Sequence, residues 1–289
     1  MPNAVGEGSA QLEQVVSAVR ASPKYRSVDE GFVRRLAAIE MQKRRSWKEA
    51  VKATKNKLHQ VGGAYQQETG ERAIAEWLAE LEQIEPEDPD PAALGEFCRR
   101  VMARHASTCE RLPILDTFYA TTLGGIAPVE SVLDLACGLN PLAIPWMPLA
   151  PNAAYYACDI YTDQAAFLTR FLEKIRVWGE VTTCDLTHSV PARRAQVALL
   201  LKTLPCLEQV DPSIGLRLLD EIQANFLLVS FPAHSLGGRS KGMRENYAAR
   251  FKEMLGKRDW NYEQFEFPNE VAFLVKKNEN RGPRSGNRI

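Results

Sequence analysis

Several features that would assign a function at once are missing from this sequence. The 289-residue chain carries 36 basic and 36 acidic residues, so its total charge favours neither a polyanionic nor a polycationic partner. Its six cysteines form no CxxC pair, and neither they nor the four histidines have the spacing of zinc ligands. The first ten residues lack the apolar stretch of a signal peptide, and no apolar run is long enough to cross a membrane. We therefore expect a cytoplasmic monomer with reduced, buried thiols, no metal and no membrane contact.

The neutral total conceals segments of opposite charge. Residues 24–59 hold eleven Lys or Arg against four acids, and residues 68–91 hold nine acids against a single Arg72. A third segment, residues 236–258, has seven basic residues against two acidic ones. This division is typical of a surface that binds a polyanion, although ordinary solvated helix faces would produce the same pattern.

The first 106 residues carry only helical patterns. Apolar residues recur at helical spacing over residues 11–21 and 28–60, and an acidic amphipathic segment covers residues 71–84. Three prolines in "EPEDPDP" interrupt regular structure before a further helix begins at residue 92. We predict an all-helical N-terminal domain over residues 1–106 that uses its basic part to bind RNA.

From residue 107 onward, short apolar runs alternate with amphipathic helical stretches. Near-continuous apolar strands separated by helices indicate a parallel sheet that is covered on both faces. "NYEQFEF" and "EVAFLVKK" are separated only by "PN", which is too short for a crossover helix, so these two strands must form an antiparallel hairpin. The five strands that precede the hairpin are predicted at residues 131–137, 153–160, 179–186, 196–204 and 225–231.

This order of elements predicts an α/β fold. It is the Rossmann-like sheet of class I methyltransferases with a terminal antiparallel hairpin, over residues 107–277, preceded by the all-helical domain. Residues 278–289 are polar and basic and contain Gly and Pro, so we expect them to form a disordered tail.

Three residues at successive strand ends suggest a nucleoside site. In "LDLACGLNP" the first strand ends at Gly138, and Asp159 follows it by 21 residues at the end of the second strand. An acid at that distance is placed to accept hydrogen bonds from ribose hydroxyls. Asp185 ends the third strand and is suited to an adenine amino group. Each aspartate alone would also serve as a helix N-cap, so the inference depends on all three residues together.

The single glycine narrows the choice of cofactor. The three-glycine turn of dinucleotide sites lets the backbone approach a pyrophosphate, which S-adenosylmethionine does not contain. S-adenosylmethionine is therefore the predicted cofactor. Arg111, in a segment just before the sheet, is suited to its carboxylate, although a plain surface arginine would look the same in the sequence.

Several longer motifs then coincide. "HASTCERLP", "LDLACGLNP", "LLLKTLPCLE", "VSFPAHSLGGRSKGM" and "ENY" resemble the aminoglycoside-resistance 16S ribosomal RNA methyltransferases, which methylate N7 of one guanine in the decoding site of the 30S subunit. The resemblance extends over about residues 20–277. It implies cofactor contacts from Tyr65, His105, Ala106, Ser107, Arg111, Ala136, Gly138, Asp159, Asp185, Leu186, Leu201 and Gln209.

The same resemblance implies an RNA-facing set and a partner, the 30S subunit with its 16S rRNA. The basic loop "GGRSKGM" also suits RNA phosphates by its charge, and Met243 or Tyr247 would pack on a displaced base. The RNA-facing residues are expected to be Arg34, Arg35, Lys52, Lys55, Lys57, Lys202, Arg239, Ser240, Lys241, Met243, Tyr247 and Glu270.

The expected chemistry needs no acid or base from the protein. Guanine N7 carries a free lone pair at neutral pH, and methyl transfer from a sulfonium is an in-line displacement that depends on proximity and orientation. We therefore assign no catalytic proton-transfer residue. A methyltransferase for another rRNA nucleotide or for a small molecule, and an RNA-binding factor that merely retains the cofactor, are the alternative functions.

Overall fold

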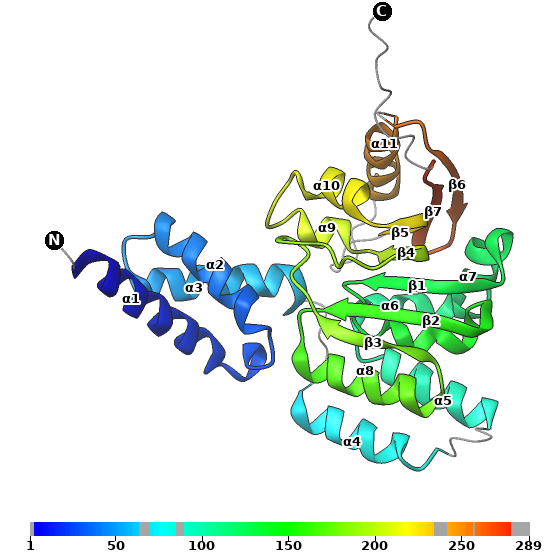
Figure 1. Cartoon of the computed structure of the whole chain (residues 1–289), viewed down its shortest axis with the longest axis horizontal. Coiled ribbons are helices and arrows are strands. Elements are labelled where there is room, and N and C mark those ends of the chain that lie inside the picture. The colour runs from blue at the N-terminus through cyan, green and yellow to red at the C-terminus, as the bar shows by residue number, and fades with distance from the viewer. Residues whose placement is uncertain (1–2, 64–69, 85–89, 234–241, 257, 279–289) are drawn as a thin grey trace, which may run out of the picture.

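The computed structural model describes residues 3–63, 70–84, 90–233, 242–256 and 258–278 (Figure 1). Its centre is a seven-stranded sheet with the strand order β3-β2-β1-β4-β5-β7-β6. The order begins at β1 and moves outward on either side of it, which creates a crevice at the carboxyl ends of the strands next to β1. The strands are β1 (Val129–Leu135), β2 (Leu149–Asp159), β3 (Trp178–Thr183), β4 (Ala195–Leu201), β5 (Ala224–Pro232), β6 (Asn261–Glu266) and β7 (Glu270–Lys276).

The sheet confirms the predicted fold class. The strands β1 to β5 pair in parallel, while β7 pairs antiparallel with both β5 and β6. The hairpin turn is closed by the Phe267 backbone N–H, which donates to the Glu270 carbonyl over 2.9 Å. β7 thus lies between β5 and β6. Successive side chains of a strand point to opposite faces of the sheet, and those of β7 are buried from Glu270 to Val275, which accounts for its nearly continuous apolar sequence.

Two apolar cores cover the two faces of the sheet. Side chains of β1 alternate between them, since Val132 joins one core and Leu133 the other. The first core is completed by α4 (Glu71–Leu81), α5 (Pro91–Met102), α7 (Leu115–Leu123) and α8 (Thr162–Lys174). The second is completed by α9 (Leu204–Leu207), α10 (Ile214–Glu221) and α11 (Met243–Leu255).

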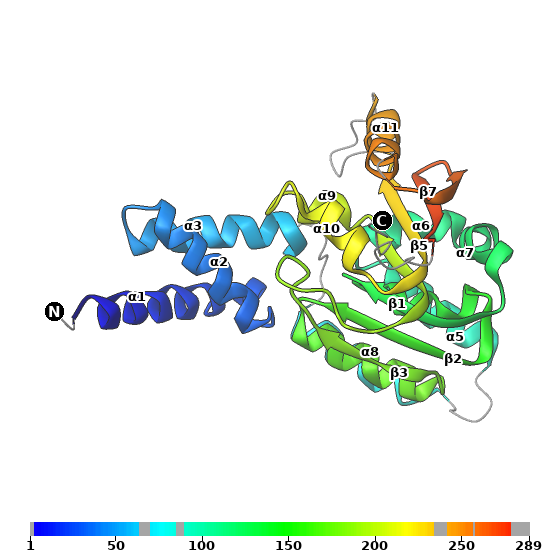
Figure 2. The same cartoon turned by 45° about the horizontal axis from the view of Figure 1, so that its top comes forward.

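The helices α1 (Asn3–Arg20), α2 (Glu30–Lys43) and α3 (Trp47–Leu58) pack mainly on one another and are called here the helical arm, and their buried side chains join the second core. The arm projects from the edge of the sheet where the parallel strands end (Figures 1 and 2). The helix predicted over residues 28–60 is interrupted, because the Ser46 side chain caps α3 by accepting from the Glu49 N–H. An antiparallel bridge between Val28 and Tyr161 attaches the arm to the end of β2.

The helical segment before residue 106 does not pack as one unit. Whereas α1–α3 form the arm, Ile74 and Trp77 of α4 and Phe97 of α5 belong to the core under the sheet. Trp77 packs against Phe167 of α8 with ring centroids 5.5 Å apart. The acidic α4 therefore packs on the methyltransferase sheet rather than within the arm (Figure 1), and its first residue, Glu71, pairs with Arg26 of the basic segment over 3.2 Å.

The thiol prediction was wrong for one pair of cysteines. Cys158, in β2, and Cys184, just after β3, form a disulfide with their Cα atoms 5.7 Å apart. Sequence spacing does not reveal it because the pairing depends on the register of two adjacent strands. The other four cysteines form no disulfide among the described residues. In the described ranges, no helix is both long and apolar enough to cross a membrane.

The predicted tail, residues 278–289, lies outside the described residues except for Asn278.

Candidate cofactor site

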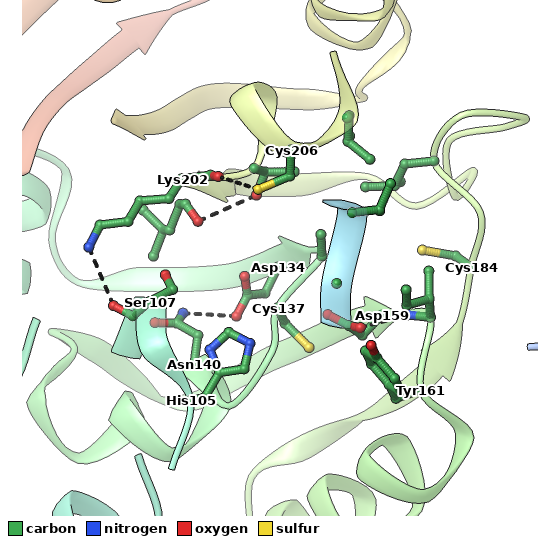
Figure 3. Close-up of a pocket in the computed structure, with 18 of the residues that line it drawn as sticks. His105, Ser107, Asp134, Cys137, Asn140, Asp159, Tyr161, Cys184, Lys202 and Cys206 are labelled. Atoms are coloured by element: carbon green, nitrogen blue, oxygen red, sulfur yellow. Dashed lines mark hydrogen bonds between the residues drawn. The ribbon is translucent and has the colours of Figure 1, made fainter. Parts of the chain in front are cut away.

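A cavity that is open to solvent lies beyond the carboxyl ends of β1, β2 and β4. In Figure 3, side chains from the ends of these three strands surround the hollow together with His105 and Ser107. Eight of the residues expected to contact cofactor line it: His105, Ser107, Arg111, Ala136, Asp159, Asp185, Leu186 and Leu201. Gly138 lies behind this lining and donates its backbone N–H to Asp159.

The turn after β1 contains two residues in the left-handed conformation, although only one of them is a glycine. Ala136 and Gly138 both have φ of 52°, a left-handed conformation that ordinarily favours glycine. A Cβ at Gly138 would lie 2.7 Å from Cε1 of His105, so only glycine fits against that imidazole. The alanine therefore adopts the strained conformation where it has room, and the glycine lies where it does not.

The Asp159 carboxylate is fixed by backbone donors. Its Oδ2 accepts from the Gly138 N–H over 2.8 Å, and its Oδ1 accepts from the Ile160 N–H over 2.7 Å. Burial raises the pKa of Asp159, and these hydrogen bonds oppose the increase. An oriented carboxylate at the end of β2 is suited to ribose hydroxyls, as the sequence predicted.

Asp185 is held from two sides. Its Oδ2 accepts from Nε of Arg35 over 2.6 Å, and its Oδ1 accepts from the backbone N–H and the hydroxyl of Thr187 over 2.9 and 2.6 Å. Arg35 was expected to face RNA, and it instead joins the helical arm to the edge of the cavity. The carboxylate lines the cavity where an adenine amino group was expected, but both oxygens already have partners.

Arg111 is fully buried at the floor of the cavity. Nη2 donates to Oε1 of Glu270 over 2.8 Å, and Nη1 donates to Oδ1 of Asn140 over 3.0 Å. Although burial disfavours its charge, Glu270 raises the pKa of Arg111. Among the described residues the buried Nε has no hydrogen-bond partner, which leaves one donor for a carboxylate in the cavity.

Two residues expected to face RNA are buried instead. Glu270 is fully buried, and Arg111 and Lys202 hold the pKa of its carboxyl below the usual range against the effect of burial. Lys202 is 5% exposed and pairs with Glu110 over 2.6 Å and with Glu270 over 3.4 Å. A buried charge requires a partner, and these residues provide partners for one another under the cavity floor.

Asp134 was missed by sequence reasoning. It lines the cavity from β1 and accepts from Tyr155 Oη over 2.7 Å and from Asn140 Nδ2 over 2.9 Å. Burial raises its pKa to about 6, while the hydrogen bonds and Arg111 oppose that increase. A polar residue inside the apolar run "SVLDLAC" was the signal that could have identified it.

The protonation state of His105 follows from its surroundings. Burial lowers its pKa to about 4, and the cations Arg111 and Lys202 act in the same direction. The imidazole beside Gly138 is therefore neutral at physiological pH.

The helical arm also contributes to the cavity wall, which the sequence did not predict. Phe32 of α2 and Val61 and Gly62 after α3 line it together with Tyr161. A Cβ at Gly62 would lie 2.9 Å from the Tyr161 hydroxyl oxygen. The arm is thus part of the site rather than an appendage.

The remaining expected residues lie outside the cavity lining or are not described. Ala106 is buried at the start of α6 (Ala106–Arg111), and Gln209 is exposed outside the lining. Arg34 pairs with Glu13 and Glu30, and Tyr247 stacks on Phe231 with ring centroids 5.4 Å apart. Lys52 is exposed and Lys55 half-buried on α3, Lys57 donates to the Gln209 carbonyl, and Met243 is half-buried at the start of α11. Tyr65, Arg239, Ser240 and Lys241 lie outside the described residues.

The family of this chain is identified by comparison with known protein families. The model of the ribosomal RNA methyltransferase (FmrO) family matches residues 21–275. The chain belongs to this family. The match confirms the resemblance seen in the motifs, and it includes the helical arm from η1 (Pro23–Tyr25) onward as well as the sheet.

Individual relatives in the ribosomal RNA methyltransferase (FmrO) family agree along nearly the whole chain. The 16S rRNA (guanine(1405)-N(7))-methyltransferase of Frankia casuarinae is 40% identical over 277 residues, 94% of this chain and 96% of that protein. The enzyme of the same name from Micromonospora rosea is 36% identical, over 93% and 98%. The crystal structure of the 16S rRNA methyltransferase RmtF in complex with S-adenosyl-L-homocysteine has a TM-score of 0.79 at 30% identity, covering 93% of this chain and 98% of that one.

The cavity fits S-adenosylmethionine by its donors and acceptors. The buried Arg111 Nε offers a donor for a carboxylate, while Asp134 and Asp159 offer negative charge for an amine and a sulfonium. The cofactor, when bound, supplies a methyl group on a cationic sulfur. Because His105 is neutral, it adds no repulsive charge beside that cation.

Proposed function

We propose that this chain transfers a methyl group from S-adenosylmethionine to N7 of a guanine in the decoding site of 16S rRNA, and thereby gives aminoglycoside resistance. The relatives named above carry guanine(1405)-N7 in their names, and we propose the equivalent guanine as the target here. The observation that carries the proposal is the family match over residues 21–275 together with a cavity whose acids and arginine suit this cofactor.

The residues at the site serve to bind and orient. Asp159, fixed by the Gly138 N–H, is proposed to hold the ribose, and Arg111 the carboxylate. Guanine N7 needs no base, which agrees with a cavity whose histidine is neutral because burial lowers its pKa to about 4. Proximity and alignment are then the main contributions of the protein to the rate.

We further propose that the intact 30S subunit in the cytoplasm is the substrate and that the chain acts as a monomer. Exposed Lys52 and half-buried Lys55 on the helical arm are suited to rRNA phosphates. The target base must leave its stack to reach the cavity, at a cost of a few kcal/mol that these contacts have to offset.

The experiment that tests the proposal supplies purified protein with a labelled methyl donor and compares intact 30S subunits, naked 16S rRNA and small phenols. We expect label in the RNA of intact 30S subunits. Label in phenols alone would favour a small-molecule methyltransferase, and cofactor binding without transfer to any acceptor would favour an RNA-binding factor.

A further inference from the structure

The carboxylate of Asp185 is held by protein donors at both oxygens. Nε of Arg35 donates to Oδ2 over 2.6 Å, and Thr187 donates to Oδ1 twice, from its backbone N–H and from its hydroxyl. Nη2 of Arg35 donates to the Thr187 hydroxyl and lies 2.5 Å from Oδ2 as part of the ion pair. The guanidinium therefore covers Oδ2, and an adenine amino group that binds at that oxygen must compete with Arg35.

Arg35 is the donor that can leave. Thr187 follows Asp185 by two residues and is held next to it by the chain, whereas Arg35 comes from α2 of the helical arm. The side chains of Arg35 and Asp185 are 27% and 14% exposed, so the guanidinium can move into solvent without being buried unpaired. A second hollow, lined by Gly31, Arg35 and His188, opens on the outer side of this ion pair.

We propose that Asp185 is shared between the cofactor adenine and Arg35, and that cofactor loading releases Arg35 to contact an rRNA phosphate. The part of this inference that concerns rRNA rests on the proposed function. The part that concerns Asp185 rests only on binding of the cofactor. Without cofactor, Arg35 stays on Asp185. With cofactor, the adenine amino group takes an Oδ2 lone pair, and the guanidinium turns toward the outer hollow beside the basic arm.

Thermodynamic linkage fixes the sign of the coupling between cofactor binding and RNA binding. Cofactor and RNA both favour the state in which Arg35 has left Asp185, so each tightens the binding of the other by the same factor. Breaking a partly exposed ion pair of this kind corresponds to a change of about threefold in the dissociation constant of either ligand. Arg35 is accordingly a positioning residue, since it acts on the cofactor only through Asp185.

Calorimetry with two ligands isolates the competition. S-adenosylhomocysteine carries the amino group, whereas S-inosylhomocysteine has a carbonyl oxygen there and cannot donate to Asp185. Arg35→Met is expected to bind the adenosyl ligand about threefold more tightly than the wild-type chain does, and the inosyl ligand no more tightly. The matched control is Arg20→Met, because Arg20 pairs with Glu30 inside the arm and should leave both affinities unchanged.

Binding to 30S subunits tests the RNA half. S-adenosylhomocysteine should tighten 30S binding of the wild-type chain about threefold and leave that of Arg35→Met unaffected. If Arg35→Met melts at a lower temperature, Thr187→Ala serves instead, because it removes the hydroxyl to which Nη2 of Arg35 donates, loosens Arg35 at Asp185 and should likewise favour the adenosyl ligand alone. The proposal is overturned if Arg35→Met weakens or does not change adenosyl binding, if both ligands gain equally, or if the cofactor leaves 30S binding unchanged. A wild-type chain that never methylates 30S RNA would count against the proposed function, while the calorimetry alone still decides the competition for Asp185.

Discussion

The backbone N–H of Gly138 donates to Oδ2 of Asp159 across 2.8 Å, joining the turn after β1 to the end of β2. The hydrogen bond aims the carboxylate into the cavity. It also explains why a glycine and an acid separated by 21 residues act together. Gly138 itself has a left-handed φ of 52°.

Replacing Asp159 should therefore weaken cofactor binding. Asp159→Ala removes the proposed ribose acceptor and leaves the Gly138 N–H without its partner, which corresponds to a loss of affinity of about 10- to 100-fold. Calorimetry with S-adenosylhomocysteine measures the effect. Asp116→Ala, at an exposed carboxylate on α7, is the matched control, and an equal loss there would remove the assigned role of Asp159.

Gly138 should tolerate no side chain. Gly138→Ala places a Cβ 2.7 Å from Cε1 of His105 and adds the left-handed strain of about 1–2 kcal/mol. We expect a lower melting temperature and a loss of cofactor affinity, with partial recovery in Gly138→Ala/His105→Ala. Gly124→Ala, which meets nothing within 4 Å, should behave like the wild-type chain. If the double variant does not recover, the loss is caused by backbone strain at residue 138 rather than by the contact with the imidazole.

The buried pair of Arg111 and Glu270 should be costly to break. Glu270→Met leaves a buried guanidinium with one charged partner fewer, and such losses destabilise by about 3–5 kcal/mol. Urea unfolding of Arg111→Met, of Glu270→Met and of the double variant Arg111→Met/Glu270→Met measures the coupling. We expect the double variant to lose less than the sum of the two single losses. Simple additivity would mean that the two charges do not stabilise each other.

Cofactor affinity should depend on pH through Asp134. Because burial raises its pKa to about 6, the unliganded protein loses stability from this group as pH rises from about 4 toward 6. A cationic sulfonium favours the ionised form, so affinity for S-adenosylmethionine should increase between pH 5 and 7. S-adenosylhomocysteine, whose sulfur is neutral, should respond less.

Asp134→Asn is the control for that titration. It should flatten the dependence, apart from a contribution of the same sign from Asp159, whose pKa is also raised by burial. A wild-type affinity that is constant or falls over this range would contradict the role of Asp134.

Thiol titration tests the disulfide between Cys158 and Cys184. In denaturant without reductant, four of the six cysteines should react, and all six should react once reductant is added. Six reactive thiols at the outset would restore the sequence-based expectation of a fully reduced protein.

The sheet could be predicted from the sequence because β1, β4, β5 and β7 carry nearly continuous apolar runs and the final hairpin has a loop too short for any other connection. Gly138, Asp159 and Asp185 followed from the same logic, since parallel strands present their carboxyl ends at one edge. Asp134 escaped notice because an acid inside a buried strand acquires meaning only from its partners Tyr155 and Asn140.

The burial of Glu270 and Lys202 could not be predicted for a related reason. The sequence shows charged residues but not that Arg111, 159 positions before Glu270, lies within hydrogen-bond distance of it. The pairing of Arg35 with Asp185 likewise depends on how the helical arm meets the sheet, and no local pattern encodes that contact.

One measurement tests the central claim most directly. Intact 30S subunits are treated with the purified chain and S-adenosylmethionine, and the methylated nucleotide of 16S rRNA is identified by nucleoside mass spectrometry and mapped by strand cleavage at 7-methylguanine. We predict 7-methylguanine at a single decoding-site position, formed more slowly by Asp159→Ala than by the wild-type chain when S-adenosylmethionine is below saturation. Unmodified 30S RNA, or a methyl group on adenine or on a guanine elsewhere, would contradict the account.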